Sequence, residues 1–169
     1  MGLRRSQVLS FLREGGYSVV FLQETHTDPT AEDSWWLDWG DRVYFSHLTV
    51  CTTGVATLFS PDQRPEVLGV AEAVPGHLLH LWVCMEGLVV SLINVYAPTS
   101  GPERLQFYQQ TSAFLSTLDP HECLVLGGDF NTTLEEQDHS GTEQFIYHVS
   151  TFHKPTPPAS GLPHFLTII

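Results

Sequence analysis

The chain is poor in positively charged residues. Seven lysines and arginines stand against 19 aspartates and glutamates among 169 residues, which gives a formal net charge of −12 at pH 7. Proteins that hold a nucleic-acid backbone tightly usually carry a basic face, which this composition does not favour. Arg4, Arg5 and Arg13 cluster near the start, so the remaining sequence is more acidic still. The charge balance therefore argues against tight binding to DNA.

Cysteines and long apolar segments are scarce as well. Cys51, Cys84 and Cys123 are an odd number without C-x-x-C spacing, which favours thiols in a reducing compartment over disulfides or zinc ligands. No apolar run reaches the 18 or so residues that a membrane span needs, and no apolar segment follows the charged residues 1–5 to make a secretory signal. We therefore expect an intracellular protein, nuclear or cytoplasmic, without a membrane segment.

The composition is otherwise that of one folded domain. Hydrophobic residues make up 42% of the chain and aromatic residues 11%, which is enough for a buried core. Val8, Phe11 and Leu12 follow helical spacing and predict an amphipathic helix over residues 7–14. A strand over 17–22 follows after two glycines, and this step from helix to strand is typical of α/β folds.

The middle of the chain alternates between turn residues and short apolar segments. We expect a helix after Thr30, and its Trp35, Trp36 and Trp39 are more typical of a core than of a base-stacking surface. Residues 61–65 are expected to form a loop. The pattern further predicts four strands, a helix and a last strand, in the order 42–48, 54–60, 77–85, 88–96, 102–118 and from 123 onward.

The most informative segment is the strand that begins at Cys123. It runs into Gly127 and Gly128, which we expect to end the strand pairing and bend the chain. Asp129 and Asn131 then stand at the carboxyl end of a strand, where open α/β sheets commonly bind ligands. Two apart, they would face one spot with a carboxylate for a hard cation and an amide for an anionic oxygen. The alternative is a hairpin turn in which both side chains bond their own backbone.

Two earlier strands also end in polar residues. The sequence QETH follows the first strand at 23–26, and NVYAPT follows a later one at 94–99. Taken alone, Glu24 is interpretable as a solvated strand-end acid and Tyr96 as a core tyrosine with a wet hydroxyl. Three such strand ends build one pocket if their strands are neighbours.

Three short motifs occur in an order and spacing that resemble a known superfamily. Residues 22–25 read LQET, residues 94–98 read NVYAP and residues 127–131 read GGDFN. Together they are similar to the endonuclease/exonuclease/phosphatase superfamily, above all to the apurinic-type endonuclease domain of LINE-type retrotransposons, over residues 2–144. The resemblance implies an α/β fold, a two-layer β-sandwich flanked by helices in four α/β/β/α layers, of which this chain would carry the N-terminal part.

The resemblance also implies a catalytic site. Glu24 and Asp129 would bind a divalent cation, Mg²⁺ or alternatively Mn²⁺, and Asp129 would also position or activate water. Asn131 would hydrogen-bond the phosphate or the ligands of the metal, and Tyr96 would act near the phosphate or the leaving group. The implied reaction is hydrolysis of DNA phosphodiester bonds.

The end of the chain departs from this superfamily. Two further motifs, an Asp-bearing strand end and a Ser-Asp-His-like triplet, are expected after residue 144 and are not found. Residues 145–169 hold four prolines and three histidines without periodicity. We interpret residues 1–144 as a partial endonuclease/exonuclease/phosphatase domain and residues 145–169 as a divergent, disordered tail.

Three functional interpretations follow. The first is a Mg²⁺-dependent nuclease that the missing motifs impair and that binds DNA weakly because of its net charge. The second is a non-catalytic remnant of a retrotransposon endonuclease domain, since missing strands leave sheet edges and apolar surface uncovered. The third is a phosphatase of the same superfamily acting on inositol phosphates or phospholipids, which the acidic charge would suit and the retrotransposon-like motifs argue against.

Overall fold

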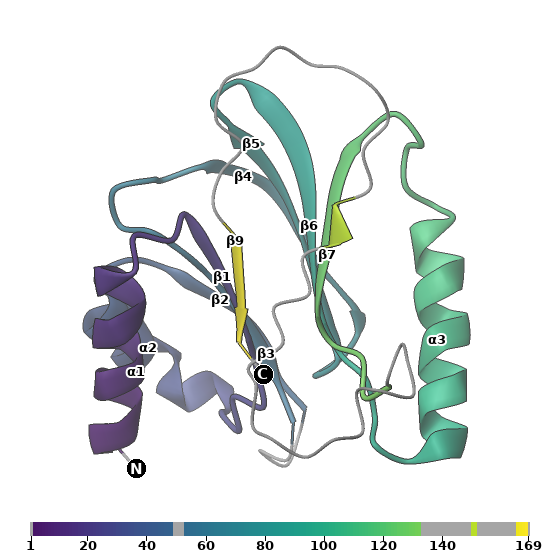
Figure 1. The fold of residues 1–169 in the computed structure, drawn as a ribbon, viewed down its shortest axis with the longest axis horizontal. Coiled ribbons are helices and arrows are strands. Elements are labelled where there is room, and N and C mark those ends of the chain that lie inside the picture. Colours follow the sequence, from purple (N-terminus) through teal and green to yellow (C-terminus); the bar gives the residue numbers. More distant parts are fainter. Residues whose placement is uncertain (1, 49–52, 133–149, 152–164, 169) are drawn as a thin grey trace.

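Two β-sheets lie at the centre of the protein, in a computed structural model that describes residues 2–48, 53–132, 150–151 and 165–168 (Figure 1). The first, sheet A, has the strand order β2-β3-β1-β9. Its strands are β1 (Val19–Gln23), β2 (Val43–Ser46), β3 (Val55–Phe59) and β9 (Phe165–Ile168). Because β1 pairs antiparallel with β3 and parallel with β9, it lies inside sheet A and all its residues are buried.

The second sheet, sheet B, has the order β4-β5-β6-β7-β8. Its strands are β4 (Glu66–Val74), β5 (Leu78–Met85), β6 (Leu88–Tyr96), β7 (Cys123–Asp129) and β8 (Ser150–Thr151). β4, β5 and β6 form an antiparallel meander, whereas β6 and β7 are parallel and are connected through α3 (Gly101–Leu115). A parallel pair needs such a crossover, and it brings the carboxyl ends of β6 and β7 to the same edge.

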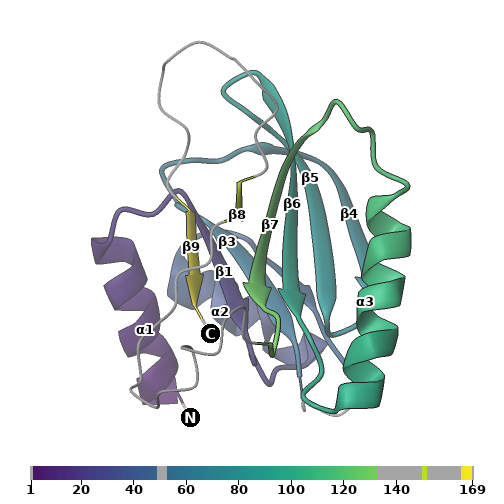
Figure 2. The same ribbon diagram turned by 45° about the vertical axis from the view of Figure 1, so that its right-hand side comes forward.

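Helices cover the outer faces of both sheets (Figure 2). α1 (Gly2–Glu14) and α2 (Glu32–Trp39), the latter preceded by the short 3-10 helix η1 (Pro29–Ala31), pack on sheet A, and α3 packs on sheet B. A further apolar cluster fills the space between the sheets, with members such as Val19, Phe21, Val55, Leu81, Leu92 and Val125. Each such burial contributes roughly 1.5–3 kcal/mol. The predicted α/β fold, with two packed sheets and helices outside, is confirmed.

Several local predictions need correction. The buried face of α1 is formed by Leu9 and Leu12, while Val8 and Phe11 are 43% and 60% exposed. The apolar face of the helix is therefore rotated relative to the predicted one, since Leu9 rather than Val8 or Phe11 packs on the sheet together with Leu12. The helix expected after Thr30 begins at Glu32. The residues before it form η1, which is capped by the Asp28 side chain through a hydrogen bond from Thr30 N.

The strand β4 was not predicted at all. It follows the expected loop, lies at the edge of sheet B and is mostly exposed. Its register against β5 shifts between Val67 and Gly69 and again between Glu72 and Val74. These irregularities break the strict alternation by which a half-buried strand is recognised in a sequence.

Two strands fall within residues 145–169, where no regular element was expected. β8 pairs with β7, and β9 lies parallel to β1 from Val19 to Leu22. This is a departure from the expected disordered tail, while the domain boundary after residue 144 stays a prediction. The histidines of this segment and Cys51 lie outside the described residues, whereas Cys84 and Cys123 are free thiols, as expected. No helix among the described residues is long and apolar enough to cross a membrane.

Candidate active site

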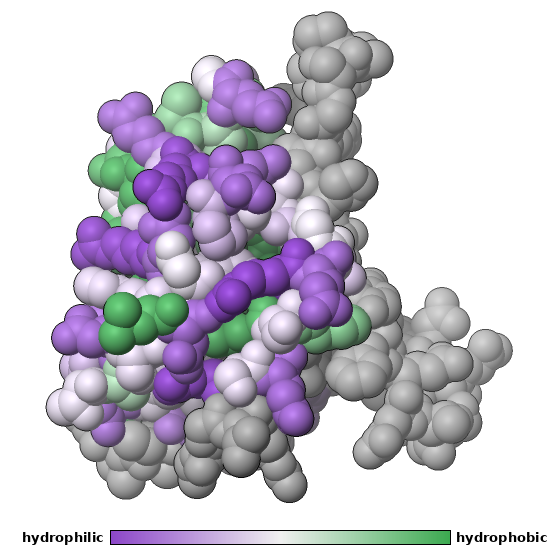
Figure 3. All heavy atoms as spheres, turned by 90° about the vertical axis from the view of Figure 1, so that its left-hand side faces the viewer, coloured by the Kyte–Doolittle hydropathy of each residue, from purple (hydrophilic) through white to green (hydrophobic). Residues whose placement is uncertain are grey.

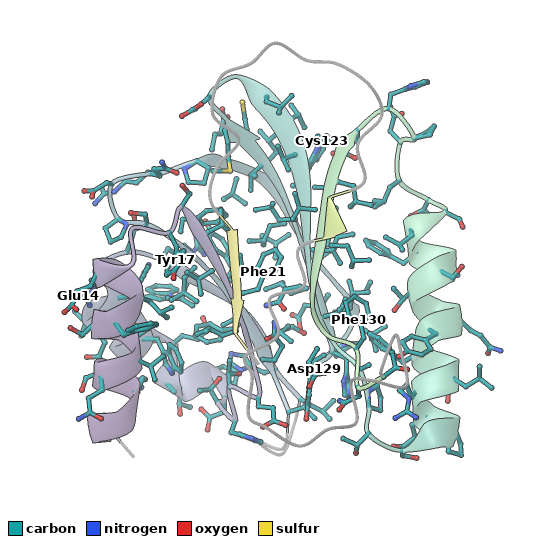
Figure 4. The ribbon with its side chains drawn as sticks, in the orientation of Figure 1. Glu14, Tyr17, Phe21, Cys123, Asp129 and Phe130 are labelled. Atoms are coloured by element: carbon teal, nitrogen blue, oxygen red, sulfur yellow. The ribbon has the colours of Figure 1, made fainter. Side chains whose placement is uncertain are left out.

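The three polar strand ends come together between the two sheets. Tyr96 and Asp129 end the neighbouring parallel strands β6 and β7 and are register partners in sheet B. Glu24 follows β1, which belongs to the facing sheet A rather than to the same sheet. The Tyr96 hydroxyl donates a hydrogen bond of 2.5 Å to Glu24 Oε1 and thereby joins the two sheets. Figure 4 shows Asp129 and Phe130 where β7 ends.

The backbone around these side chains adopts unusual conformations. Among the described residues four non-glycine residues have positive φ, and three of them, Glu24 (52°), His26 (46°) and Asn131 (48°), lie in the loops that follow β1 and β7. Left-handed backbone is costly for residues with a Cβ, and such outliers gather at functional sites. The β1 loop is anchored on Gly54, whose carbonyl accepts a hydrogen bond of 3.1 Å from Thr25 N.

The Glu24 carboxylate is paired with the Tyr96 phenol by a hydrogen bond. The Glu24 side chain is 53% exposed, and its second oxygen, Oε2, lies 3.9 Å from His26 Nε2. Burial raises the pKa of the Tyr96 phenol above its ordinary value, and the hydrogen bond to Glu24 and the charges of Glu24 and Asp129 raise this pKa further. Tyr96 therefore stays protonated at neutral pH and acts as a hydrogen-bond donor, while the Glu24 side chain remains half-exposed.

Asp129 and Asn131 are held in their own loop and by β6. Asp129 Oδ1 accepts a hydrogen bond of 2.8 Å from Asn131 N, the local bond that the hairpin-turn alternative predicted. The Asn131 side chain instead reaches across, and its Nδ2 donates to Ala97 O at 2.5 Å. Ala97 N in turn donates to Asp129 O at 2.8 Å. The loop after β7 is thus fastened to the loop after β6 from both sides.

The glycines before Asp129 do not end the strand, contrary to prediction. β7 pairs with β6 through to Asp129, because Gly128 has a φ of +136° and no side chain. A Cβ at this position would lie 1.9 Å from Val95 O. Gly128 therefore permits a close approach of the two backbones that carries Asp129 into register with Tyr96.

Sequence reasoning gave no role to three residues at this edge. Gln23 and Asn94 are buried, and Gln23 Nε2 donates to Asn94 Oδ1 at 2.6 Å. The His77 ring stacks on the Tyr96 ring at 5.9 Å between centroids, and His77 Nδ1 lies 2.6 Å from Tyr96 O. An amide inside a mainly apolar strand was the available signal for Asn94, whereas nothing in the sequence pointed to His77.

Two arginines of α1 and one of the segment after α2 are engaged away from this edge. Arg5, Arg13 and Arg42 lie over the rings of Trp35, Trp39 and Trp36 at 5.3, 5.6 and 5.4 Å from the centroids. Trp35 and Trp39 are buried, so the interpretation of the α2 tryptophans as core residues is confirmed for these two. The face of the molecule that carries α1 and α2 is largely hydrophilic, with small apolar patches (Figure 3).

A shallow hollow on that face is lined by α2 and the residues that follow it, namely Asp33, Trp36, Leu37, Gly40 and Asp41. It shares no residue with the three strand ends. At those strand ends the donors suited to a cation are carboxylate oxygens of Glu24 and Asp129. Within the described part of the chain, no group of three histidine, cysteine, aspartate or glutamate side chains is arranged to hold a metal.

Comparison with known proteins gives a consistent result. A model of the Endonuclease/Exonuclease/phosphatase family matches residues 1–165. The transposon TX1 uncharacterized 149 kDa protein of Xenopus laevis is 56% identical over 135 residues, which cover 80% of this chain. The chain spans about a tenth of the length of that protein, since the match covers 10% of it.

Solved structures share the fold. An AP endonuclease from Archaeoglobus fulgidus aligns with a TM-score of 0.64 and 24% identity over 80% of this chain and 55% of its own. D. rerio TDP2, in complex with a single-strand DNA product, aligns with a TM-score of 0.58 and 16% identity over 76% of this chain and 54% of its own. At such identities the similarity shows a common architecture.

Proposed function

Since the chain belongs to the endonuclease/exonuclease/phosphatase family, we propose that it hydrolyses phosphodiester bonds of DNA with the help of a divalent cation. The family match and the transposon relative confirm the resemblance drawn from the three motifs. The proposal depends most on one observation, the hydrogen bond from Tyr96 to Glu24. This bond joins the ends of β6 and β1. It places the half-exposed Glu24 carboxylate next to Tyr96, which is the register partner of Asp129.

The donor set fits a magnesium ion that keeps most of its water. Mg²⁺ is usually bound by one or two carboxylates together with substrate phosphates rather than by a full set of protein ligands. Glu24 and Asp129 would hold the ion, with Mn²⁺ as the alternative, and relatives of this family generally depend on divalent metals. When bound, the ion would neutralise charge on the phosphate.

The protein's own residues would then divide the remaining work. Asp129 has one oxygen bonded to Asn131 N, and its Oδ2 would accept a proton from the attacking water. Asn131 uses one amide hydrogen on Ala97 O, and the other would donate to a phosphate oxygen. Tyr96 would remain a neutral phenol that orients Glu24, because its raised pKa keeps the hydroxyl protonated at neutral pH and so leaves no phenolate to act as a base.

DNA is the proposed substrate, although binding would be weak. The net charge of −12 and the engagement of Arg5, Arg13 and Arg42 on α2 leave few cations for phosphate contacts. The same observations favour a small substrate as the second candidate, which would make the chain a phosphatase acting on inositol phosphates or phospholipids. A third outcome, a remnant without catalysis, follows if the two motifs expected after residue 144 are indispensable.

A nicking assay distinguishes these outcomes. Purified protein is incubated with supercoiled plasmid and with an abasic duplex, in Mg²⁺ or EDTA, beside Asp129→Ala and the control Asp62→Ala. Asp62 is an exposed loop acid, so its removal changes the charge equally and leaves the strand ends intact. Nicking that requires both Mg²⁺ and Asp129 supports the nuclease. Release of phosphate from inositol phosphates without nicking favours the phosphatase, and folded protein without either activity leaves the remnant.

A further inference from the structure

Two buried amides connect the sheets next to the Glu24–Tyr96 contact. Asn94 lies on β6 two residues before Tyr96 and is 0% exposed, and Gln23 ends β1 directly before Glu24 and is 7% exposed. Gln23 Nε2 donates a hydrogen bond of 2.6 Å to Asn94 Oδ1. This bond therefore connects sheet A with sheet B. On β1 it lies one residue from Glu24, and on β6 it lies two residues from Tyr96.

Neighbouring backbone groups fix the orientation of both amides. Asn94 Nδ2 donates to Leu22 O at 3.1 Å and to Ala56 O at 2.9 Å, which are carbonyls of β1 and β3. Because carbonyls only accept, Asn94 must turn its nitrogen towards the Leu22 and Ala56 carbonyls and its oxygen towards the Gln23 side chain. Gln23 then presents its nitrogen, and its Oε1 is buried without a hydrogen-bond partner among the described residues.

Stability alone does not require these amides. An apolar pair of similar size would fill the same space and would remove the unpartnered Gln23 Oε1, and replacing both partners of a buried hydrogen bond in this way is often neutral or stabilising. The apolar cluster between the sheets holds them together without directional preference. Three directed hydrogen bonds, one that Asn94 accepts from Gln23 and two that it donates to Leu22 O and Ala56 O, instead fix how β6 lies across β1 and β3.

We propose that Gln23 and Asn94 are positioning residues, which hold β1 and β6 in the relative placement that lets Tyr96 meet Glu24. This inference rests on the proposed function, because the contact matters only if Glu24 serves a reaction. A displacement of about 1 Å at a reacting group can lower a rate by about a hundredfold. Neither residue touches substrate in this scheme, and both act through Glu24 and Tyr96.

The test separates placement from stability. Three variants are compared: Gln23→Leu, Asn94→Leu and the double variant. The matched control is Ser91→Ala, which removes another hydrogen bond of a buried β6 side chain, the one between Ser91 Oγ and His80 Nε2 at 2.8 Å, but this bond stays within sheet B. The readouts are the melting temperature, the ¹³Cζ resonance of Tyr96 in tyrosine-labelled protein, and the Mg²⁺ concentration for half-maximal nicking. The resonance is assigned by its loss in Tyr96→Phe.

We expect the double variant to melt at or above the temperature of Gln23→Leu while its Tyr96 resonance moves away from the native position. Nicking should fall by about 10- to 100-fold and require more Mg²⁺, whereas Ser91→Ala should lower only the melting temperature. A folded double variant with native resonance and native activity would overturn the inference. If the native protein does not nick DNA but the resonance still moves, the positioning role stands and the proposed function fails.

Discussion

The two sheets contribute to the candidate site in different ways. Sheet B supplies Tyr96 and Asp129 from neighbouring strands whose backbones pair residue by residue up to those two positions, and Asn131 follows in the next loop. Sheet A supplies Glu24 alone, in left-handed backbone just beyond β1. Backbone pairing therefore fixes the geometry within sheet B, whereas the geometry between the sheets depends on a few side-chain hydrogen bonds.

This difference indicates where the site is robust and where it is sensitive. A backbone ladder tolerates side-chain substitution, provided that no new atom enters between its strands. A contact between sheets across apolar packing has no such ladder, so the loss of one hydrogen bond can alter it. Changes within sheet B should act on folding or on chemistry in an all-or-none manner, and changes between the sheets should produce graded effects.

The largest effect is expected from Gly128→Ala. The new Cβ would lie 1.9 Å from Val95 O, a backbone atom that cannot move aside. Residue 128 also has a positive φ, which is unfavourable for alanine. We expect the free energy of unfolding to fall by about 3 kcal/mol or more in urea denaturation. Gly87→Ala is the control, since it has a φ of +81° with no atom within 4 Å and should lose only about 1 kcal/mol. Equal losses would show that β6 and β7 are not as close as described.

Asp129→Asn should have the next largest effect, on activity rather than on folding. The amide keeps the shape and can still accept from Asn131 N, but it cannot take a proton from water. We expect the single-turnover nicking rate to fall by about 10²- to 10⁴-fold at every Mg²⁺ concentration, with an unchanged melting temperature. Recovery at high Mg²⁺ would instead assign Asp129 a purely metal-binding role.

Glu24→Gln makes the corresponding change in sheet A. The neutral amide is a weaker ligand for a hard cation, so we expect nicking to need about tenfold more Mg²⁺ and to recover in part when the metal is raised. The measurement is the nicking rate as a function of Mg²⁺ concentration, beside Asp129→Asn. If both variants recovered alike, Asp129 would serve only as a metal ligand, like Glu24, and would not activate the water.

The sequence predicted the architecture better than the connections. The runs that became β1, β6 and β7 were recognisable because buried strands are short, branched and apolar, and the motif residues Glu24, Tyr96 and Asp129 were placed at strand ends correctly. The edge strand β4 was not predicted, because its exposure and two register shifts remove the alternation of apolar and polar residues that marks a half-buried strand. Sequence patterns record which face of an element is buried, but not which strand of another sheet it will meet.

The glycines and amides illustrate the same limit at single residues. Gly127 and Gly128 read as a strand terminus, because a glycine pair usually breaks pairing, yet here Gly128 lets the strands approach more closely. Gln23 and Asn94 lie within the motifs LQET and NVYAP, but the sequence predicted no role for them, because their hydrogen bond joins residues 71 apart in the chain. Long-range polar contacts of this kind depend on how two sheets pack, which no local pattern encodes.

Tyr96→Phe should have a moderate effect. The ring would stay buried, but Glu24 Oε1 would lose its donor and the carboxylate would be free to rotate. We expect a loss of about tenfold in the nicking rate, with a modest increase in the Mg²⁺ requirement. Tyr44→Phe is the control, because Tyr44 lies on β2 against Phe59 and its hydroxyl has no role at the strand ends. A native rate in Tyr96→Phe would mean that Glu24 is positioned without the phenol.

The smallest effect is expected in the alkaline stability of the protein. Because burial and Glu24 raise the pKa of Tyr96, folded Tyr96 keeps its proton at pH values where the unfolded tyrosine, with an ordinary pKa near 10, has lost it. The unfolded state then binds fewer protons than the folded state, so stability must fall as the pH rises above about 10. Tyr44 and Tyr108 have raised pKa values too and contribute to this fall in any variant that retains them. The stability advantage of the native protein over Tyr96→Phe, measured as the difference in melting temperature from pH 8 to pH 12, should therefore be constant below about pH 10 and shrink above it. An advantage that grew with pH would mean that the phenol ionises more readily in the folded state, and Tyr96 could then serve as a base rather than as the fixed donor that links the two sheets.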